Sequence, residues 1–141
     1  MGLTQSMEKI GFEDMQSVIK KPELYILINT LTETEQNCLI PNTVNFDQEE
    51  IIINSHLKNG NKNVRIIIYG KNCNDDKIIK KYQQLSSFGF YNIFIYTGGM
   101  FEWLLLQDIY GSNEFPTTAK QLDLLKYKPP QKFNICLLQY S

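Results

Sequence analysis

The residue of this chain with the clearest potential for covalent chemistry is Cys73, because of the loop in which it lies. Residues 70–75 interrupt an apolar stretch with turn formers, and an amphipathic stretch follows. A loop between a buried strand and the start of a helix gathers backbone N–H groups, whose dipoles favour a thiolate nucleophile. Cys73 is therefore a candidate nucleophile. The competing interpretation, an ordinary exposed loop cysteine, is the one that we favour.

The other reactive side chains do not make a second candidate site. His56 is the single histidine, and it lies at the predicted end of a helix, so no base would activate a nucleophile as in a catalytic triad. A zinc site built from His56 with Cys38, Cys73 and Cys136 lacks the short paired spacings of zinc ligands. The sequence therefore predicts neither a metal nor another cofactor.

The loop of Cys73 is positioned by the segments on either side of it. Residues 64–69 are apolar and β-branched, as in a strand that is buried on both faces of a parallel sheet. In residues 76–88, apolar side chains recur at intervals of three and four, which predicts an amphipathic helix, and Gly89 suits its left-handed C-terminal cap. Strand, loop and helix make half of a βαβ unit.

The chain continues with a second predicted strand over residues 90–96. Gly98 and Gly99 then turn it into a helix that contains Trp103, for which we favour a core position over one that faces a partner. Upstream, residues 12–19 predict a short first helix. The start of another helix is indicated by three acidic residues: Asp47, Glu49 and Glu50. We favour this interpretation of the acidic cluster over a metal site.

The order of these pieces resembles the signature of the rhodanese-like domain family. In residues 89–96 a glycine and a phenylalanine follow the helix, an asparagine and aliphatic residues form the strand, and the double glycine then precedes Trp103. Residues 26–29 are similar to the family's first strand, and residues 39–45 to a segment that leads into an edge-proximal strand. The resemblance implies a three-layer α/β/α fold with a central, mainly parallel five-stranded sheet, over residues 10–118.

The resemblance also implies where the family's chemistry would take place, and the decisive residue is missing there. The family's cysteine nucleophile corresponds to Gly70, and Asp75 lies near the place of an arginine that helps to hold an anionic sulfur donor. Asp75 and Asp76 favour the helix start but oppose the approach of thiosulfate or phosphate. We therefore predict that sulfur transfer has been lost, with a degenerate active-site loop of Gly70, Lys71, Asn72, Cys73, Asn74 and Asp75.

The sequence leaves three functions to compare. The one that we favour is a catalytically inactive binding or scaffold subunit of a larger assembly, whose partners are proteins. The second is a thiosulfate sulfurtransferase or persulfide carrier that uses Cys73. The third, a phosphatase relative of the same fold, also requires the nucleophile that Gly70 lacks.

The composition excludes several other classes. A formal net charge of −1 and lysines that cluster only in pairs give no basic field for nucleic acid. No apolar run approaches the length of a membrane span, and we expect no cleavable signal sequence. Three irregularly spaced cysteines suit a reducing compartment, so we predict a cytoplasmic protein. The 141 residues predict one domain between a flexible N-terminus, residues 1–9, and a C-terminal extension or tail, residues 119–141.

The first six residues match the pattern for N-myristoylation. Gly2 follows the initiator methionine, and Ser6 occupies the sixth position. The competing interpretation is simply a disordered start. A single myristoyl chain binds membranes only marginally, and no nearby cysteine or basic patch would add to it. Acylation of Gly2 would therefore give reversible membrane association, or would place the acyl chain in a protein groove.

Overall fold

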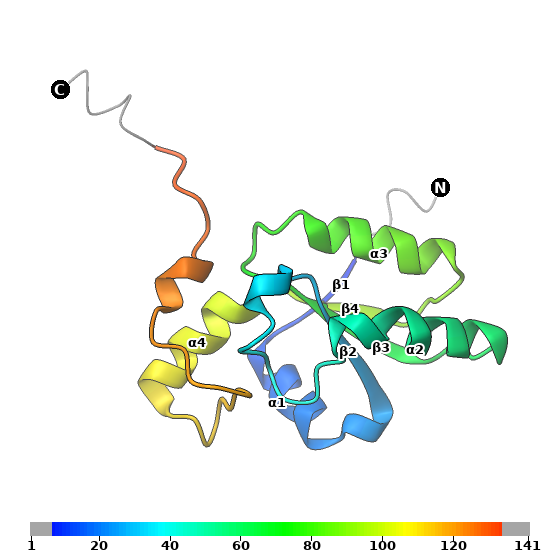
Figure 1. Cartoon of the computed structure of the whole chain (residues 1–141), viewed down its shortest axis with the longest axis horizontal. Coiled ribbons are helices and arrows are strands. Elements are labelled where there is room, and N and C mark those ends of the chain that lie inside the picture. Colours follow the sequence, from blue (N-terminus) through cyan, green and yellow to red (C-terminus); the bar gives the residue numbers. More distant parts are fainter. Residues whose placement is uncertain (1–6, 134–141) are drawn as a thin grey trace.

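Four short strands form one parallel sheet in the computed structural model, which describes residues 7–133 (Figure 1). Their order across the sheet is β1 (Glu8–Ile10), β4 (Ile93–Tyr96), β3 (Arg65–Tyr69) and β2 (Tyr25–Asn29). All three pairings are parallel, so the carboxyl ends of the strands meet at one edge of the sheet.

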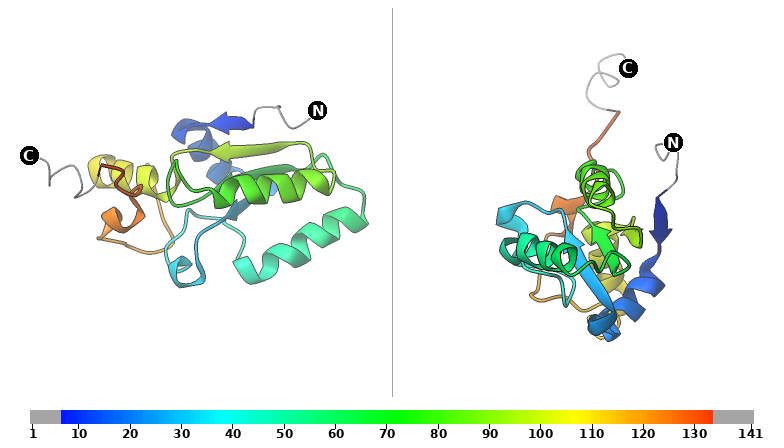
Figure 2. Two further views of the ribbon diagram at one scale, coloured as in Figure 1. Left: turned by 90° about the horizontal axis from the view of Figure 1, so that it is seen from above. Right: turned by 90° about the vertical axis from the view of Figure 1, so that its right-hand side faces the viewer.

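Side chains of the central strand β3 are buried on both faces, and this sets the layers. Ile66 and Ile68 belong to one core with α2 and α3, whereas Ile67 and Tyr69 belong to a second core with α1 and α4. The sheet separates the two cores (Figure 2), so the predicted three-layer fold is confirmed. The helices are α1 (Phe12–Lys20), α2 (Phe46–Lys58), α3 (Lys77–Ser87) and α4 (Gly99–Tyr110), with short 3-10 turns η2 (Pro22–Leu24), η3 (Glu33–Glu35) and η4 (Leu124–Tyr127).

The predicted fifth strand is present only as a single bridge in the part of the chain that the structure describes. Thr43 bridges Leu27 beside β2, and the N–H of Val44 donates to the Leu27 carbonyl at 2.8 Å. Asn42 has a left-handed φ of 70°, and the Thr43 N–H turns back to the Ile40 carbonyl. Extended backbone therefore lasts for too few residues to make a ladder before α2 begins, and the prediction of five strands is corrected to four.

The segments around the predicted loop form close to where the sequence placed them. β3 and α3 correspond to the strand and the helix predicted over residues 64–69 and 76–88. Gly89 has a φ of 100° just beyond α3, in the left-handed region that favours glycine. Trp103 is fully buried, as favoured, and its indole N–H donates to the Pro116 carbonyl at 2.8 Å.

The ordered domain extends beyond the predicted limits of residues 10–118 at both ends. Glu8 and Lys9, which we expected in the flexible N-terminus, pair with β4 as part of β1. In the C-terminal extension, η4 packs against α4, and Tyr127 is fully buried. The first six residues, with Gly2, and residues 134–141 lie outside the described part. From residue 7 to residue 133, no helix is both long enough and apolar enough to cross a membrane.

Candidate functional site

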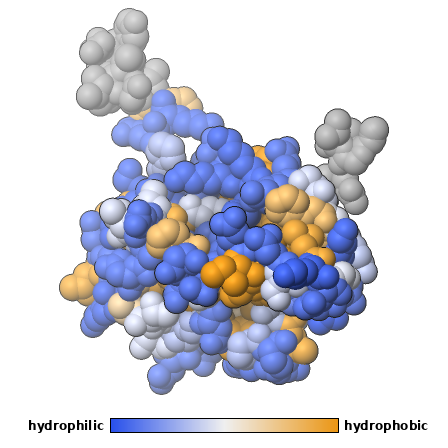
Figure 3. Space-filling model, turned by 45° about the vertical axis from the view of Figure 1, so that its right-hand side comes forward, coloured by the Kyte–Doolittle hydropathy of each residue, from blue (hydrophilic) through white to orange (hydrophobic). Residues whose placement is uncertain are grey.

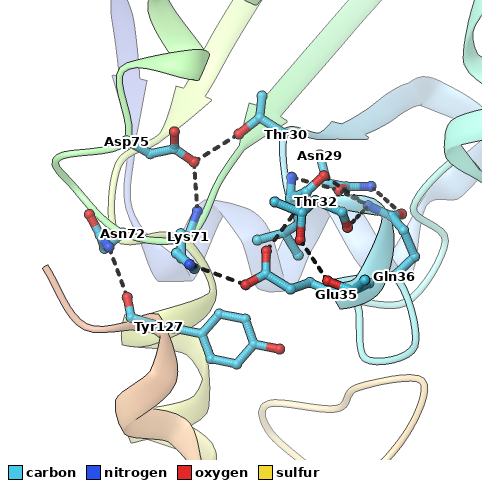
Figure 4. Close-up of polar contacts among 11 residues, drawn as sticks. Asn29, Thr30, Thr32, Glu35, Gln36, Lys71, Asn72, Asp75 and Tyr127 are labelled. Carbon is cyan, nitrogen blue, oxygen red and sulfur yellow. Dashed lines mark hydrogen bonds and ion pairs between the residues drawn. The ribbon is translucent and has the colours of Figure 1, made fainter.

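The loop that joins β3 to α3 lies at the carboxyl edge of the sheet, beside the residues that follow β2 (Figure 4). In open α/β sheets, ligands bind at this edge. Thr30, the first residue after β2, is tied to β3 by a hydrogen bond from its N–H to the Tyr69 carbonyl, 3.0 Å long. The predicted loop of residues 70–75 is thus where the family's active site would be.

The Asp75 side chain turns back into this loop and accepts three hydrogen bonds. Its Oδ2 accepts from the Lys71 backbone N–H and from the Thr30 hydroxyl, both at 3.0 Å (Figure 4). Its Oδ1 accepts from the Lys77 N–H at 3.0 Å, in the first turn of α3. A carboxylate near a helix N-terminus is electrostatically favourable. The donors of the loop therefore already hold an anion, and that anion is part of the chain.

Gly70 makes room for this carboxylate. A Cβ atom built at residue 70 would lie 2.6 Å from the Thr30 hydroxyl oxygen, and closer still to Asp75 Oδ2. Both separations are shorter than real Cβ atoms show. A cysteine at residue 70 would thus compete with Asp75 for one space. Gly70 and Asp75, which the sequence presented as two separate features, therefore form a single packing arrangement.

The first turn of α4 is hydrogen-bonded to the loop. The N–H groups of Met100 and Phe101 donate to the carbonyls of Gly70 and Lys71, each at 2.9 Å. Gly99 has a φ of 65°, and a Cβ there would lie 2.7 Å from the Gly70 carbonyl oxygen. Gly99 therefore allows its own backbone and that of Gly70 to approach closely, and this contact helps to set the shape of the loop.

Cys73 points away from this arrangement. Its side chain is exposed, and its Sγ lies 3.8 Å from Asn74 Oδ1. Nearby backbone donors are used elsewhere, because the Asn74 N–H donates to Asn72 Oδ1 at 2.8 Å and the Asp75 N–H to the Asn72 carbonyl at 3.3 Å. These amides do not converge on the sulfur, as a stabilised thiolate would require.

Lysine and carboxylate side chains surround the mouth of the loop. Lys71 Nζ lies 3.2 Å from Glu35 Oε2. Burial raises the pKa of Glu35, but hydrogen bonds from Thr32 and the Lys71 charge outweigh it and hold the pKa below its ordinary value. The open pocket here, of about 210 Å³, is lined by two lysines, Lys71 and Lys77, and by three carboxylates, Glu35, Asp75 and Asp76. Such a lining gives a negative balance that does not attract an anionic donor.

Asn72 connects the loop to the C-terminal extension. Its side chain is buried, and its Nδ2 donates to the Tyr127 carbonyl at 2.8 Å (Figure 4). The sequence did not identify Thr30, Glu35 or Tyr127 as parts of this site. Thr30 could have been found, because it follows a predicted strand and the carboxyl ends of parallel strands meet at one edge. Nothing in the sequence pattern indicates Tyr127.

The remaining described candidate residues take separate positions. His56 lies in the last turn of α2, whereas Glu49, in the first turn, forms an ion pair with Lys81 and lines an open pocket together with Thr30 and Lys77. Cys38 is buried in the core that contains α1 and α4. Cys136 lies outside the described residues.

Comparison with known protein families agrees with this geometry. The model of the Rhodanese-like domain matches residues 13–106, which is more than half of the chain. The chain belongs to this family. The matched region of this rhodanese-like domain runs from α1 to α4 and includes the whole loop with Gly70 and Asp75.

Solved structures share the fold at low sequence identity. The Alr3790 protein of Anabaena sp. is 18% identical and matches 83% of this chain and 97% of that chain, with a TM-score of 0.57. The single-domain sulfurtransferase RDL2 of Saccharomyces cerevisiae is 19% identical, over 80% and 98%, with a TM-score of 0.54. The thiosulfate sulfurtransferase of Pseudomonas aeruginosa is 15% identical, over 74% of this chain and 20% of that chain, with a TM-score of 0.56. No curated protein matches the chain.

Proposed function

We propose that this rhodanese-like domain does not transfer sulfur and serves as a binding or scaffold subunit of a larger assembly. The observation that carries the proposal is the Asp75 carboxylate, which fills the space beside Gly70 where the family's cysteine side chain is expected. The carboxylate accepts the hydrogen bond that the Lys71 N–H could otherwise donate to a substrate, and its charge repels an anionic sulfur donor. The loop thereby keeps its form and loses both the nucleophile and the place for the substrate.

The alternative function, sulfur transfer through Cys73, has less support. The thiol is exposed, and its neighbouring amides are bonded to Asn72 and Asp75. A persulfide on Cys73 would thus lie outside the loop, without the converging donors that stabilise an anionic sulfur. The sulfurtransferases among the similar structures do not favour this function, because identities below 20% show the fold alone.

Thiocyanate formation from thiosulfate and cyanide is the direct test of inactivity. We expect the full chain to form no more thiocyanate than its Cys73→Ala variant does. Intact-mass measurement after incubation with thiosulfate should show no added sulfur. Turnover by the wild-type chain that is lost in both Cys73→Ala and Cys73→Ser would show that the proposal is wrong and that the alternative is right.

The scaffold role is supported by hydrophobic side chains that remain exposed near α4. On the face that Figure 3 presents, hydrophobic groups are small and separated by hydrophilic residues, as on an ordinary surface. On and after α4, five large apolar side chains are between 36% and 82% exposed: Leu105, Ile109, Tyr110, Leu122 and Leu125. Purification of the tagged chain from its native source should recover partner proteins in fixed stoichiometry. Recovery of a monomer that carries persulfide on Cys73 would contradict the scaffold role.

Reversible membrane association and a cytoplasmic location remain proposals. Both start from the sequence, because Gly2 lies outside the described residues. Intact-mass measurement of the native protein should show a myristoyl group on Gly2, and the Gly2→Ala variant should lack it. An acetylated or unmodified N-terminus in the native protein would refute acylation.

A further inference from the structure

The segment after α4 is held firmly in its first part. The Pro116 carbonyl accepts from the Trp103 indole at 2.8 Å. Thr118 makes two hydrogen bonds with Leu39: its N–H donates to the Leu39 carbonyl at 2.8 Å, and its hydroxyl oxygen accepts from the Leu39 N–H at 3.0 Å. The thiol of Cys38 donates to the Ala119 carbonyl at 3.3 Å. Up to Ala119 this segment is part of the folded core.

The following segment, residues 120–130, is held loosely, and we name it the cover segment. Within residues 7–133, its one hydrogen bond to the rest of the domain is that from Asn72 Nδ2 to the Tyr127 carbonyl. Its other hydrogen bonds are internal, such as that from the Lys128 N–H to the Leu125 carbonyl. Tyr127 is also its one fully buried side chain. Leu124 packs partly buried against the same core, so the attachment depends mainly on Tyr127.

Burial of the Tyr127 side chain also has an unfavourable contribution to the free energy of attachment. Among the described residues, the Tyr127 hydroxyl is buried and has no hydrogen-bond partner. Burial, with the nearby Cys38 and Glu35, raises the pKa of Tyr127 to about 12, so the hydroxyl is neutral. A buried donor without a partner costs free energy only while it is buried. The residue that docks the cover segment thus also opposes docking.

The cover segment spans a hollow and lies over groups that are otherwise sheltered. An open pocket of about 610 Å³ is lined by residues of α4 and of the segment 112–124, so this part of the chain is not packed tightly on the helix. Beneath the docked Tyr127 lie the side chain of Asn72, from the degenerate loop, and the buried thiol of Cys38.

We propose that the cover segment is a releasable lid. It opens as a unit beyond Ala119 while the sheet and its helices stay folded, and it uncovers Asn72 and the Cys38 thiol. This goes beyond the proposed scaffold role, because it makes the face of the degenerate loop accessible in one state and covered in the other.

Site-resolved alkylation of the full chain tests the lid. Iodoacetamide is added under native conditions, and the modification of each cysteine is followed by peptide mass spectrometry. Tyr127→Ala removes the buried ring but leaves the backbone carbonyl that accepts from Asn72, and we expect Cys38 to react at least about tenfold faster because the ring contributes most of the attachment. Tyr127→Phe removes only the unpartnered hydroxyl, and we expect Cys38 to react several-fold to about tenfold more slowly. Cys73, which is already exposed, should react at the same rate in every variant and serves as the internal reference.

The opposite signs of these two changes separate a lid from general destabilisation. The control is Ile53→Ala, which weakens the other core, on the far side of the sheet. This variant should leave the reactivity of Cys38 close to that of the wild type. If it accelerates Cys38 as much as Tyr127→Ala does, global unfolding exposes the thiol and the proposal fails. Acceleration by Tyr127→Phe would also overturn it, and this comparison remains decisive if Tyr127→Ala does not fold.

Discussion

Replacing Gly70 with alanine tests whether residue 70 and Asp75 compete for one space. Gly70 does not have a positive φ, so an alanine suits its backbone. Such a change ordinarily stabilises a protein by about 0.4–1 kcal/mol, because it reduces the entropy of the unfolded chain. Here the new methyl group would displace the Asp75 carboxylate from Thr30 and from the Lys71 N–H.

The size of the effect follows from those two hydrogen bonds. Bonds to a charged group contribute about 1.5–3 kcal/mol when buried, and about 1 kcal/mol each is a fair value for the half-buried Asp75. Together with the crowding of the Thr30 hydroxyl, this outweighs the entropic gain. We expect Gly70→Ala to lower the free energy of unfolding by about 1–2 kcal/mol.

Urea unfolding followed by the fluorescence of Trp103, the one tryptophan of the chain, measures this quantity. In a double-mutant cycle, Asp75→Ala should remove most of the penalty of Gly70→Ala, with a coupling of about 1 kcal/mol or more. Gly11→Ala is the matched control, because a Cβ at Gly11 would meet nothing within 4 Å. If Gly70→Ala is as stable as the wild type, or if the two changes are additive, the shared-space argument is wrong.

Three further predictions concern the same loop. Gly70→Cys alone should give a thiol that iodoacetamide modifies slowly. Adding Asp75→Ala should accelerate modification at residue 70, because the carboxylate that crowds and repels the thiolate is then gone. Equal rates in the two variants would contradict this. Gly99→Ala should destabilise the domain by about 1–3 kcal/mol in urea unfolding, because it combines a φ of 65° with a clash against the Gly70 carbonyl; a change within error would refute the close approach. The pKa of Glu35 is lowered in the folded state, so its stabilising contribution is present above the unfolded value, near 4.5, and is lost as the pH falls through the folded value. Glu35→Gln should therefore be less stable than the wild type at pH 7, by less than about 1 kcal/mol, and the difference should vanish in unfolding measured at acid pH.

The sequence predicted the layers of the fold because they depend on local patterns. The apolar run that becomes β3 and the spacing that becomes α3 are strong signals, and Gly89 terminates the helix as its position indicated. The fifth strand was wrong because residues 39–45 carry strand-forming residues, but the left-handed Asn42 breaks the extended backbone. The limits of the domain were missed because Glu8 and Tyr127 are ordered by distant partners, which no local pattern reveals.

The sequence predicted a loop over residues 70–75 between a strand and a helix, and the structure contains it. That this loop is a degenerate active site stays a prediction. The sequence did not reveal that the Asp75 carboxylate points inward, to the place beside Gly70. An aspartate before a helix ordinarily suggests only a favourable charge at the helix N-terminus. The direction of a side chain in a loop depends on donors from other strands, here the Thr30 hydroxyl.

The close approach of Gly99 to Gly70 explains why the family signature does not imply the family's chemistry. The contact joins two stretches of backbone, so it imposes the same requirement whether residue 70 is a glycine or a nucleophile. The loop donors do require an acceptor, since a sheltered N–H group without a partner is costly. In an active relative that acceptor would be a sulfur species, whereas here Asp75 supplies it. Because the chain itself satisfies these donors, the form of the loop does not depend on a bound substrate.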